Sequence, residues 1–141
     1  MKEAEQEKQV AIHEIGHAAV AKSLGGEVCK ICIIPEGNAL GYTSISFSGF
    51  GAEEALIGMM ASLCGGFVAE ERSGHHDHSG CGSDMLKLDY LANIASRILH
   101  DGKSAAEHFK SRAFSIARSV MPSFADLESR ALHLQREKIL V

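Results

Sequence analysis

The sequence has little of what would tie it to an oxidising compartment or to nucleic acid. Only four of its 141 residues are cysteines, and they lie among apolar or glycine-rich neighbours, so no disulfide framework is expected. The net charge of −4, with no dense block of lysine and arginine, argues against nucleic acid or anionic lipid as the main partner. The start, MKEAEQEK, is charged where a secretory signal is apolar. We therefore expect a cytoplasmic protein.

A membrane-spanning segment and an ATP-binding motif are also missing from the pattern. The longest apolar run, Ala55 to Ala69, is interrupted by glycines and a serine and is shorter than the roughly 20 residues of a membrane helix. We expect a buried helix there and no membrane association. The sequence has no G-x-x-x-x-G-K-[ST] phosphate loop, so another chain would have to supply any ATP-driven step. The length fits one domain over residues 1–141.

The motif that is present is His13-Glu14-Ile15-Gly16-His17, the H-E-x-x-H pattern of zinc hydrolases. On a helix, residues four apart share a face, so both imidazoles turn toward one metal ion. Glu14 lies about 100° round the helix, which suits a base acting on metal-bound water. The stretch from Val10 to Ala21 has no other polar side chain, which is typical of a buried helix. The alternative is two core histidines bonded to carbonyls, with Glu14 paired to a cation.

The pattern of apolar residues predicts a mostly helical α+β domain with a small β-hairpin beside the motif helix. The first helix is expected from Glu3 to Leu24, ending at Gly25-Gly26. Its interior Gly16 indicates a close backbone approach beside the proposed metal. The hairpin is expected from two runs rich in β-forming residues and the turn between them: Val28 to Ile34, Leu40 to Phe47, and Glu36-Gly37-Asn38.

Further helices follow the hairpin. The second helix is expected over Ala52 to Arg72, with Gly65-Gly66 allowing tight helix packing. The third is expected to be capped by Ser83 and to extend to His100, before the stop signal Asp101-Gly102. Its inward residues are predicted to be Leu86, Leu91, Ile94 and Ile98. The patterns Ser104-x-x-Glu107 and Ser123-x-x-Asp126 predict the caps of two more helices, separated near Pro122.

A catalytic zinc ion usually has three protein ligands, so the chain must supply one more. A type of site with a third histidine would need Gly at position 20 and His at position 23, where this chain has Val20 and Ser23, so that type is excluded. Carboxylates remain as candidates, and composition alone does not rank them: Asp84, Glu70, Glu71, Glu53 and Glu54.

The sequence resembles the peptidase domain of the ATP-dependent, membrane-anchored zinc proteases of the FtsH type. Four stretches carry the resemblance, in the family's order and at similar intervals: HEIGHA from His13, IIPEGNALGYT from Ile33, GGFVAEE from Gly65 and SGCGSD from Ser79. The second stretch is distinctive, because a hairpin needs no such residues merely to fold.

The resemblance implies a site. It implies that His13, His17 and Asp84 bind Zn²⁺ and that Glu14 is the catalytic base. It also implies that the strand around Gly41, Tyr42, Thr43 and Ser44 offers its edge to an extended substrate, with Glu70 and Glu71 as supporting residues.

The sequence departs from the family in several respects. The family's proteases have transmembrane segments and an ATPase module upstream, whereas here Met1 comes just before the motif. We therefore expect a stand-alone peptidase domain, which a separate ATPase or unfoldase could assist. Where the family commonly has a basic residue, this chain has Glu36, and the loop at His75 is unusually rich in histidine. Family members form hexamers, largely through modules that this sequence does not contain.

The expected activity is zinc-dependent endopeptidase cleavage of unfolded or extended polypeptides, with metal-activated water and Glu14 as general base. Binding along an edge strand predicts broad sequence tolerance. Two alternatives stay open. The chain could be a metal-binding regulatory protein that keeps the peptidase-like fold without turnover, or the peptidase portion of a longer ATP-dependent protease.

Other candidate residues have a plainer interpretation beside the functional one. Residues three apart on a strand face opposite sides, so Cys29 and Cys32 are not expected to form a redox pair. The histidines of the loop, His75, His76 and His78, could form an accessory metal site or a lid, but a solvated loop is favoured. Phe47 and Phe50 could line a side-chain pocket, although ordinary packing is favoured. Met59 and Met60 are expected in the core.

Overall fold

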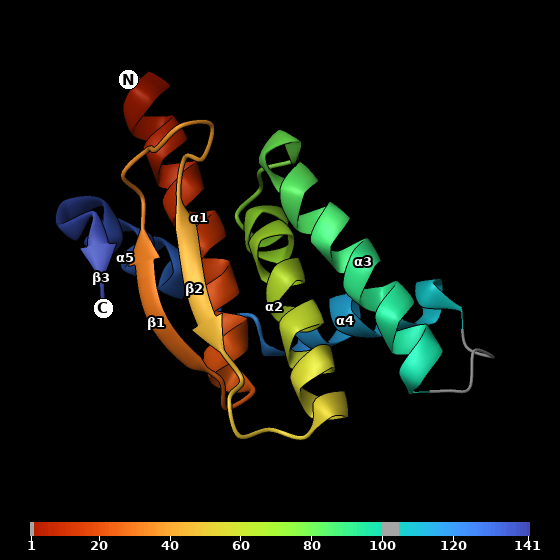
Figure 1. Cartoon of the computed structure of the whole chain (residues 1–141). Coiled ribbons are helices and arrows are strands. Elements are labelled where there is room, and N and C mark those ends of the chain that lie inside the picture. Colours follow the sequence, from red (N-terminus) through yellow and green to blue (C-terminus); the bar gives the residue numbers. More distant parts are fainter. Residues whose placement is uncertain (1, 100–104) are drawn as a thin grey trace.

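The computed structural model describes residues 2–99 and 105–141, and it has the expected mostly helical α+β architecture (Figure 1). The helices of this part are α1 (Lys2–Ser23), α2 (Ala52–Arg72), α3 (Gly82–Ile98), α4 (Ala106–Val120) and α5 (Phe124–Glu137), with a 3₁₀ turn at Ser79–Cys81. The strands are β1 (Glu27–Cys32), β2 (Tyr42–Ser46) and β3 (Ile139–Leu140). They form one antiparallel sheet in the order β2-β1-β3.

Helix α1 is the centre of the fold. Every residue from Ala11 to Ala21 is buried, because the sheet covers one side of the helix while α2 and α5 pack against others (Figure 1). The absence of polar residues from most of this stretch therefore has a structural reason. Gly25 ends the helix region with a φ of 85°, a left-handed conformation that glycine adopts without strain. The predicted end at Gly25-Gly26 is confirmed.

Helices α1 and α2 cross at a pair of glycines. A Cβ atom built on Gly16 would lie closer than 3.0 Å to the carbonyl of Gly65 and to the side chain of Ala69. A Cβ atom on Gly65 would collide in the same way with the backbone of Gly16. The predicted close backbone approach at Gly16 is thus present, and its partner is the backbone of α2.

Helix α2 begins and ends at the predicted residues. Its length and composition alone would also suit a membrane span. In the structure it packs against α1, α3 and α4, and its buried residues include Met60, Cys64 and Val68. It is therefore the second core helix of the domain.

The hairpin forms as predicted, with shorter strands. β1 and β2 pair from Glu27 opposite Ser46 to Cys32 opposite Tyr42, and a bulge lies at Cys29. In the loop that connects the two strands, Glu36 and Ala39 form an isolated antiparallel β-bridge. Strand β3, which pairs with the other edge of β1, was not predicted, since two residues give no periodic signal.

Helix α3 differs from the prediction in its start and in its inward face. It follows a 3₁₀ turn, and its N-cap residue is Cys81 instead of Ser83. Two of the predicted inward residues are exposed, Leu86 at 72% and Ile98 at 60%. Leu91 and Ile94 are partly buried against the core, and the fully buried positions are Leu88, Ala92 and Ala95. Ala92 and Ala95 let α3 approach α2 and α4 closely. The inward face therefore includes small residues, and the largest apolar side chains of the helix are not all buried.

The last two helices form where expected. Ser123 caps α5 by accepting a hydrogen bond from the backbone N–H of Asp126 at 3.2 Å, which confirms that cap. Helix α4 begins after Ala105. Its N-cap residue is Ala105, so the predicted cap at Ser104 is wrong by one residue, and α3 ends at Ile98 with Leu99 as its C-cap, slightly before the predicted end at His100. The predicted stop at Asp101-Gly102 lies outside the described residues.

The glycine crossing gives the first prediction. In Gly65→Ala, the new methyl group meets backbone atoms of Gly16 and His17 that cannot rotate away. We expect the free energy of unfolding in urea, with chelator present, to fall by about 3 kcal/mol or more. The control is Gly82→Ala in α3, where a Cβ atom meets nothing within 4 Å. Its stability should equal that of the parent or exceed it by up to about 1 kcal/mol, because alanine restricts the unfolded chain. Equal stability of the two variants would contradict the proposed crossing.

Candidate metal centre

The two histidines of the motif converge on one point beside α1. Their Nε2 atoms lie 3.0 Å apart, and the rings meet edge to face at 88°. Both residues are 7% exposed. The one-turn spacing on a helix therefore produces the arrangement that it predicted, with both Nε2 atoms directed at the same place.

Asp84, in the first turn of α3, joins the pair. Its Oδ2 atom lies 2.8 Å from Nε2 of His13 and 3.1 Å from Nε2 of His17. The other carboxylates that the sequence left open do not reach this point in the same way. Glu70 contacts Nδ1, the opposite nitrogen of the His13 ring. The other three glutamates, Glu53, Glu54 and Glu71, are exposed.

The three atoms have the chemistry and spacing of a zinc site. They are two imidazole nitrogens and one carboxylate oxygen, separated from one another by 2.8 to 3.1 Å. Ligands at about 2.0–2.1 Å from a tetrahedral ion are about 3.3 Å apart, so a small adjustment admits Zn²⁺. Three protein ligands leave a fourth position for water, as in catalytic sites.

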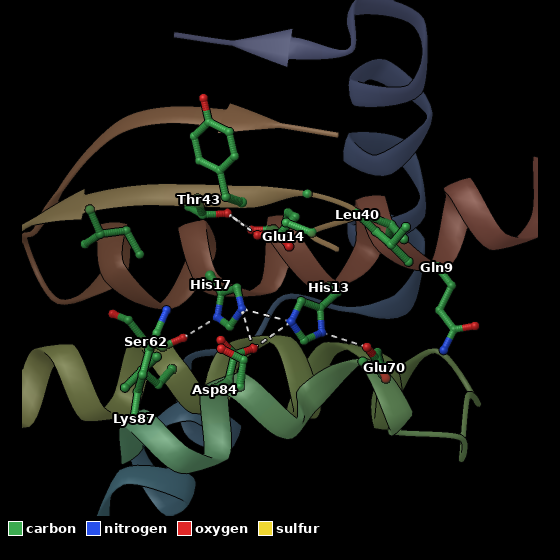
Figure 2. Close-up of a pocket in the computed structure, with 18 of the residues that line it drawn as sticks. Gln9, His13, Glu14, His17, Leu40, Thr43, Ser62, Glu70, Asp84 and Lys87 are labelled. Atoms are coloured by element: carbon green, nitrogen blue, oxygen red, sulfur yellow. Dashed lines mark hydrogen bonds and ion pairs between the residues drawn. The ribbon is translucent and has the colours of Figure 1, made fainter. Parts of the chain in front are cut away.

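The far nitrogens of both rings are held as well. Nδ1 of His13 is 2.7 Å from Oε1 of Glu70, and Nδ1 of His17 is 2.6 Å from the backbone carbonyl of Ser62 (Figure 2). A carbonyl oxygen only accepts, so Nδ1 of His17 donates and its Nε2 keeps a free lone pair. Such outer partners fix the tautomer and orientation of metal-binding histidines. No sequence pattern points to the role of Ser62, because a backbone carbonyl is present at every residue.

Gly66 makes room for the His13 ring. A Cβ atom at this position would lie 2.6 Å from both Nδ1 and Nε2 of His13. The adjacent glycines of α2 therefore have different roles, since Gly65 permits the helix crossing and Gly66 admits an imidazole. Sequence reasoning assigned both to helix packing, which is correct for Gly65 only.

Glu14 faces the strand β2 side of the centre and is 6% exposed. The hydroxyl of Thr43 donates a hydrogen bond to its Oε1 at 2.7 Å and also lies 3.1 Å from its backbone carbonyl. Figure 2 shows the two imidazoles between Glu14 and Thr43 on one side and Asp84 and Glu70 on the other. Glu14 is thus beside the ligand atoms and not among them, as its position on the helix predicted.

Hydrogen bonds within the cluster shift two pKa values in opposite directions. Burial by itself would lower the pKa of His13, but hydrogen bonds to Asp84, Cys81 and Glu70 raise it to about 12. Burial would raise the pKa of Asp84, whereas the hydrogen bonds from His13 and His17 hold it well below its usual range. Because a metal ion needs the neutral imidazole, the raised pKa of His13 makes a proton compete with metal binding at this ring.

A cleft of about 1030 Å³ opens over these residues. Its walls come from α1, β2 with the loop before it, α2 and α3, and many of its side chains are apolar. They include Leu40, Ile45, Met59, Leu63 and Leu91. Met59 is 38% exposed there, so the prediction that it belongs to the core is wrong, while Met60 at 1% is core as predicted.

Strand β2 forms one border of the cleft. It pairs with β1 on one side only in the described part of the chain, so its other edge has main-chain groups available. Gly41, Tyr42 and Thr43 line the cleft, whereas Ser44 does not. A Cβ atom on Gly41 would lie 3.3 Å from Cγ of Glu14 and 2.9 Å from the carbonyl of Cys32. Glycine here lets the strand lie against the helix at the position of Glu14.

The remaining candidates have structural roles. Phe47 packs over Gly26 and Gly58, and Phe50 meets it edge to face at 5.3 Å. Neither lines the cleft, so ordinary packing is correct. Cys29 is exposed and Cys32 buried, both as free thiols, as predicted from their strand.

The histidine-rich loop contributes no ligand cluster of its own. Among the described residues, two groups could hold a metal ion: His13 with His17 and Asp84, and His13 with Glu70 and Cys81. Neither group includes His75, His76 or His78. His76 is exposed. His78, in contrast, folds back onto Glu70, with 3.2 Å between Nδ1 and Oε2. The expectation of a solvated loop is therefore wrong for His78.

Two histidines one turn apart, a carboxylate from another helix and a glutamate beside the first histidine, all in one cleft, are typical of a zinc-peptidase centre. The model of peptidase family M41 matches residues 1–101, more than half of the chain, and the protein belongs to this family.

Similar proteins named ATP-dependent zinc metalloprotease FtsH come from several bacteria. The one from Cutibacterium acnes (strain SK137) is 39% identical over 87 residues, which is 58% of this chain and 12% of that protein. The one from Malacoplasma penetrans (strain HF-2) is 44% identical over 73 residues, 48% of this chain and 9% of that protein. The one from Myxococcus xanthus (strain DK1622) is 30% identical over 127 residues, which is 80% of this chain and 20% of that protein. The chain thus spans a small part, a fifth or less, of these relatives, and the FtsH-type resemblance of the sequence is confirmed.

The raised pKa of His13 predicts a proton exchange. At pH 6, zinc binding to chelator-treated protein should release one proton or more, because zinc requires the neutral imidazole of His13 while the metal-free pKa of that ring is about 12. Zinc affinity should consequently rise with pH. Calorimetric titration in buffers of different ionisation enthalpy measures the proton count. His76→Ala, in the exposed part of the loop, should give the same number. A count near zero would show that His13 is neutral before zinc binds.

Proposed function

We propose that this domain is a zinc-dependent endopeptidase that hydrolyses unfolded or extended polypeptides. The observation that supports it most is the meeting of three metal-binding atoms, from His13, His17 and Asp84, in a cleft bordered by an edge strand. Metallopeptidase activity agrees with membership of family M41 and with the names of the relatives.

The proposed chemistry assigns a role to each side chain. When bound, zinc supplies an activated water molecule and polarises the peptide carbonyl. Glu14 would accept a proton from the attacking water and donate it to the leaving nitrogen. Thr43 holds Oε1 of Glu14, so the proton is carried on Oε2. Glu70 and the carbonyl of Ser62 keep the imidazoles in the orientation for metal binding.

The substrate is proposed to add to the free edge of β2 as an extended strand. Tyr42 and Ser44 are on the exposed face of the strand, and the hydroxyl of Thr43 is engaged by Glu14. We therefore assign substrate binding by the segment from Gly41 to Ser44 to main-chain hydrogen bonds, which do not depend on the substrate's side chains. The apolar walls of the cleft then favour apolar substrate side chains.

An ATPase or unfoldase is the proposed partner of the domain. The relatives are named ATP-dependent, and this sequence has no phosphate loop. A separate ATPase or unfoldase, or further modules of a longer chain, would therefore unfold and deliver protein substrates. Cytoplasmic location stays a prediction, consistent with the four free cysteines.

The role of Glu14 gives a direct test. Glu14→Gln keeps the size of the side chain but removes the base, so it should bind zinc normally, keep its thermal stability within a few degrees, and hydrolyse an unfolded, fluorescently labelled casein at least about 100-fold more slowly. Chelation should abolish hydrolysis by the parent protein, and added zinc should restore it.

The matched control is Glu53→Gln, an exposed glutamate at the start of α2, which should retain parental activity. Zinc-dependent cleavage that survives Glu14→Gln would remove Glu14 from the mechanism. Zinc binding without any cleavage by the parent chain, even for short peptides, would favour the regulatory binding protein instead.

A further inference from the structure

We propose that His78 is a positioning residue of the metal centre, acting on His13 through the carboxylate of Glu70. The inference rests on the zinc site proposed above. Three side chains form a continuous series of contacts away from that site: His13, Glu70 and His78 (2.7 Å and 3.2 Å). Only the first of them touches the metal position.

The contacts are set by what the buried carboxylate needs. Glu70 is 3% exposed, and a carboxylate removed from water must have hydrogen-bond donors on its oxygens. For His13 to use Nε2 as a metal ligand, its Nδ1 must hold the hydrogen and donate it to Oε1 of Glu70. The other oxygen, Oε2, then accepts from Nδ1 of His78.

Two donors on two oxygens fix the carboxylate plane. With Oε1 bound alone, the carboxylate could rotate about its last side-chain bond and carry the His13 ring with it. The Cys81 thiol lies 3.9 Å from Oε1, so it is a weaker contact to the same oxygen and does not replace His78. Donation at Oε2 therefore limits the orientations available to Glu70 and, through it, to His13.

The ring of His78 is itself held in place. It stacks on Phe67 with 3.8 Å between ring centroids and 20° between planes. Phe67 lies one turn before Glu70 on α2 and meets Phe114 of α4 edge to face. The backbone N–H of His75 also donates to the carbonyl of Glu70 at 2.9 Å. The loop thus returns to the last turns of α2 and presents the His78 nitrogen there before any metal binds.

Two substitutions separate the hydrogen bond from the stacking. His78→Phe keeps an aromatic ring for Phe67 and removes the donor, whereas His78→Asn keeps an N–H near the position of Nδ1 and removes the ring. The exposed His76→Ala in the same loop is the matched control. The dissociation constant for zinc is measured for each by competition with a chromophoric chelator, together with the melting temperature of the metal-free protein.

We expect His78→Phe to weaken zinc binding about 3- to 10-fold, less than the about 10- to 100-fold typical of a residue that contacts a metal ligand directly. His78→Asn should stay within about twofold of the parent, and His76→Ala should equal it. A role in packing alone would give the reverse order, with the phenylalanine variant normal and the asparagine variant impaired, and would overturn the proposal.

The route through Glu70 is tested by a double-mutant cycle. In a Glu70→Gln background, His78→Phe should weaken zinc binding by less than about twofold, because the carboxylate it acts on is gone. An undiminished effect in that background would exclude the proposed route. If the parent chain binds no zinc, the proposed function fails. If it binds one zinc ion and His78→Phe has the same affinity, only the role of His78 fails.

Discussion

The buried middle of α1 holds two imidazoles and a carboxylate beside the cleft, with less than a tenth of each residue exposed to water, and the rest of the structure is arranged around that constraint. His13, Glu14 and His17 are each less than a tenth exposed, so every polar atom needs a partner from the protein or a metal ion. The carbonyl of Ser62, the carboxylates of Glu70 and Asp84, and the hydroxyl of Thr43 supply these partners from α2, α3 and β2. These contacts satisfy the buried polar groups of α1, and they also orient its side chains for binding a metal ion.

Close packing makes this arrangement rigid. The glycine crossing brings the α2 backbone against α1, so the carbonyl of Ser62 and the carboxylate of Glu70 arrive on the side of the helix where the imidazoles are. Gly66 then leaves space for one ring, and Gly41 lets β2 lie against Glu14. A larger residue at any of these positions would change distances at the centre. Preorganisation of this kind places the proposed base and metal ligands without a conformational change.

Much of the fold could be predicted from sequence because its signals are local. The helices, the hairpin, the Ser123 cap and the common face of His13 and His17 follow from periodicity, capping residues and spacing. Asp84 could not be ranked above the other carboxylates by the same reasoning, since its place depends on the packing of α3 against α2; only the family resemblance singled it out. The roles of Ser62 and His78 and the pairing of β3 also depend on long-range contacts, so local patterns could not predict them. The same is true of the inward face of α3, where two of the three fully buried residues are alanines.

Anomalous diffraction at the zinc absorption edge would show whether His13, His17 and Asp84 bind one zinc ion. We expect a single strong peak about 2.0–2.2 Å from Nε2 of both histidines and from an oxygen of Asp84. A peak in the loop of residues 75–78, or a peak beside the histidines with the aspartate well beyond bonding distance, would contradict it.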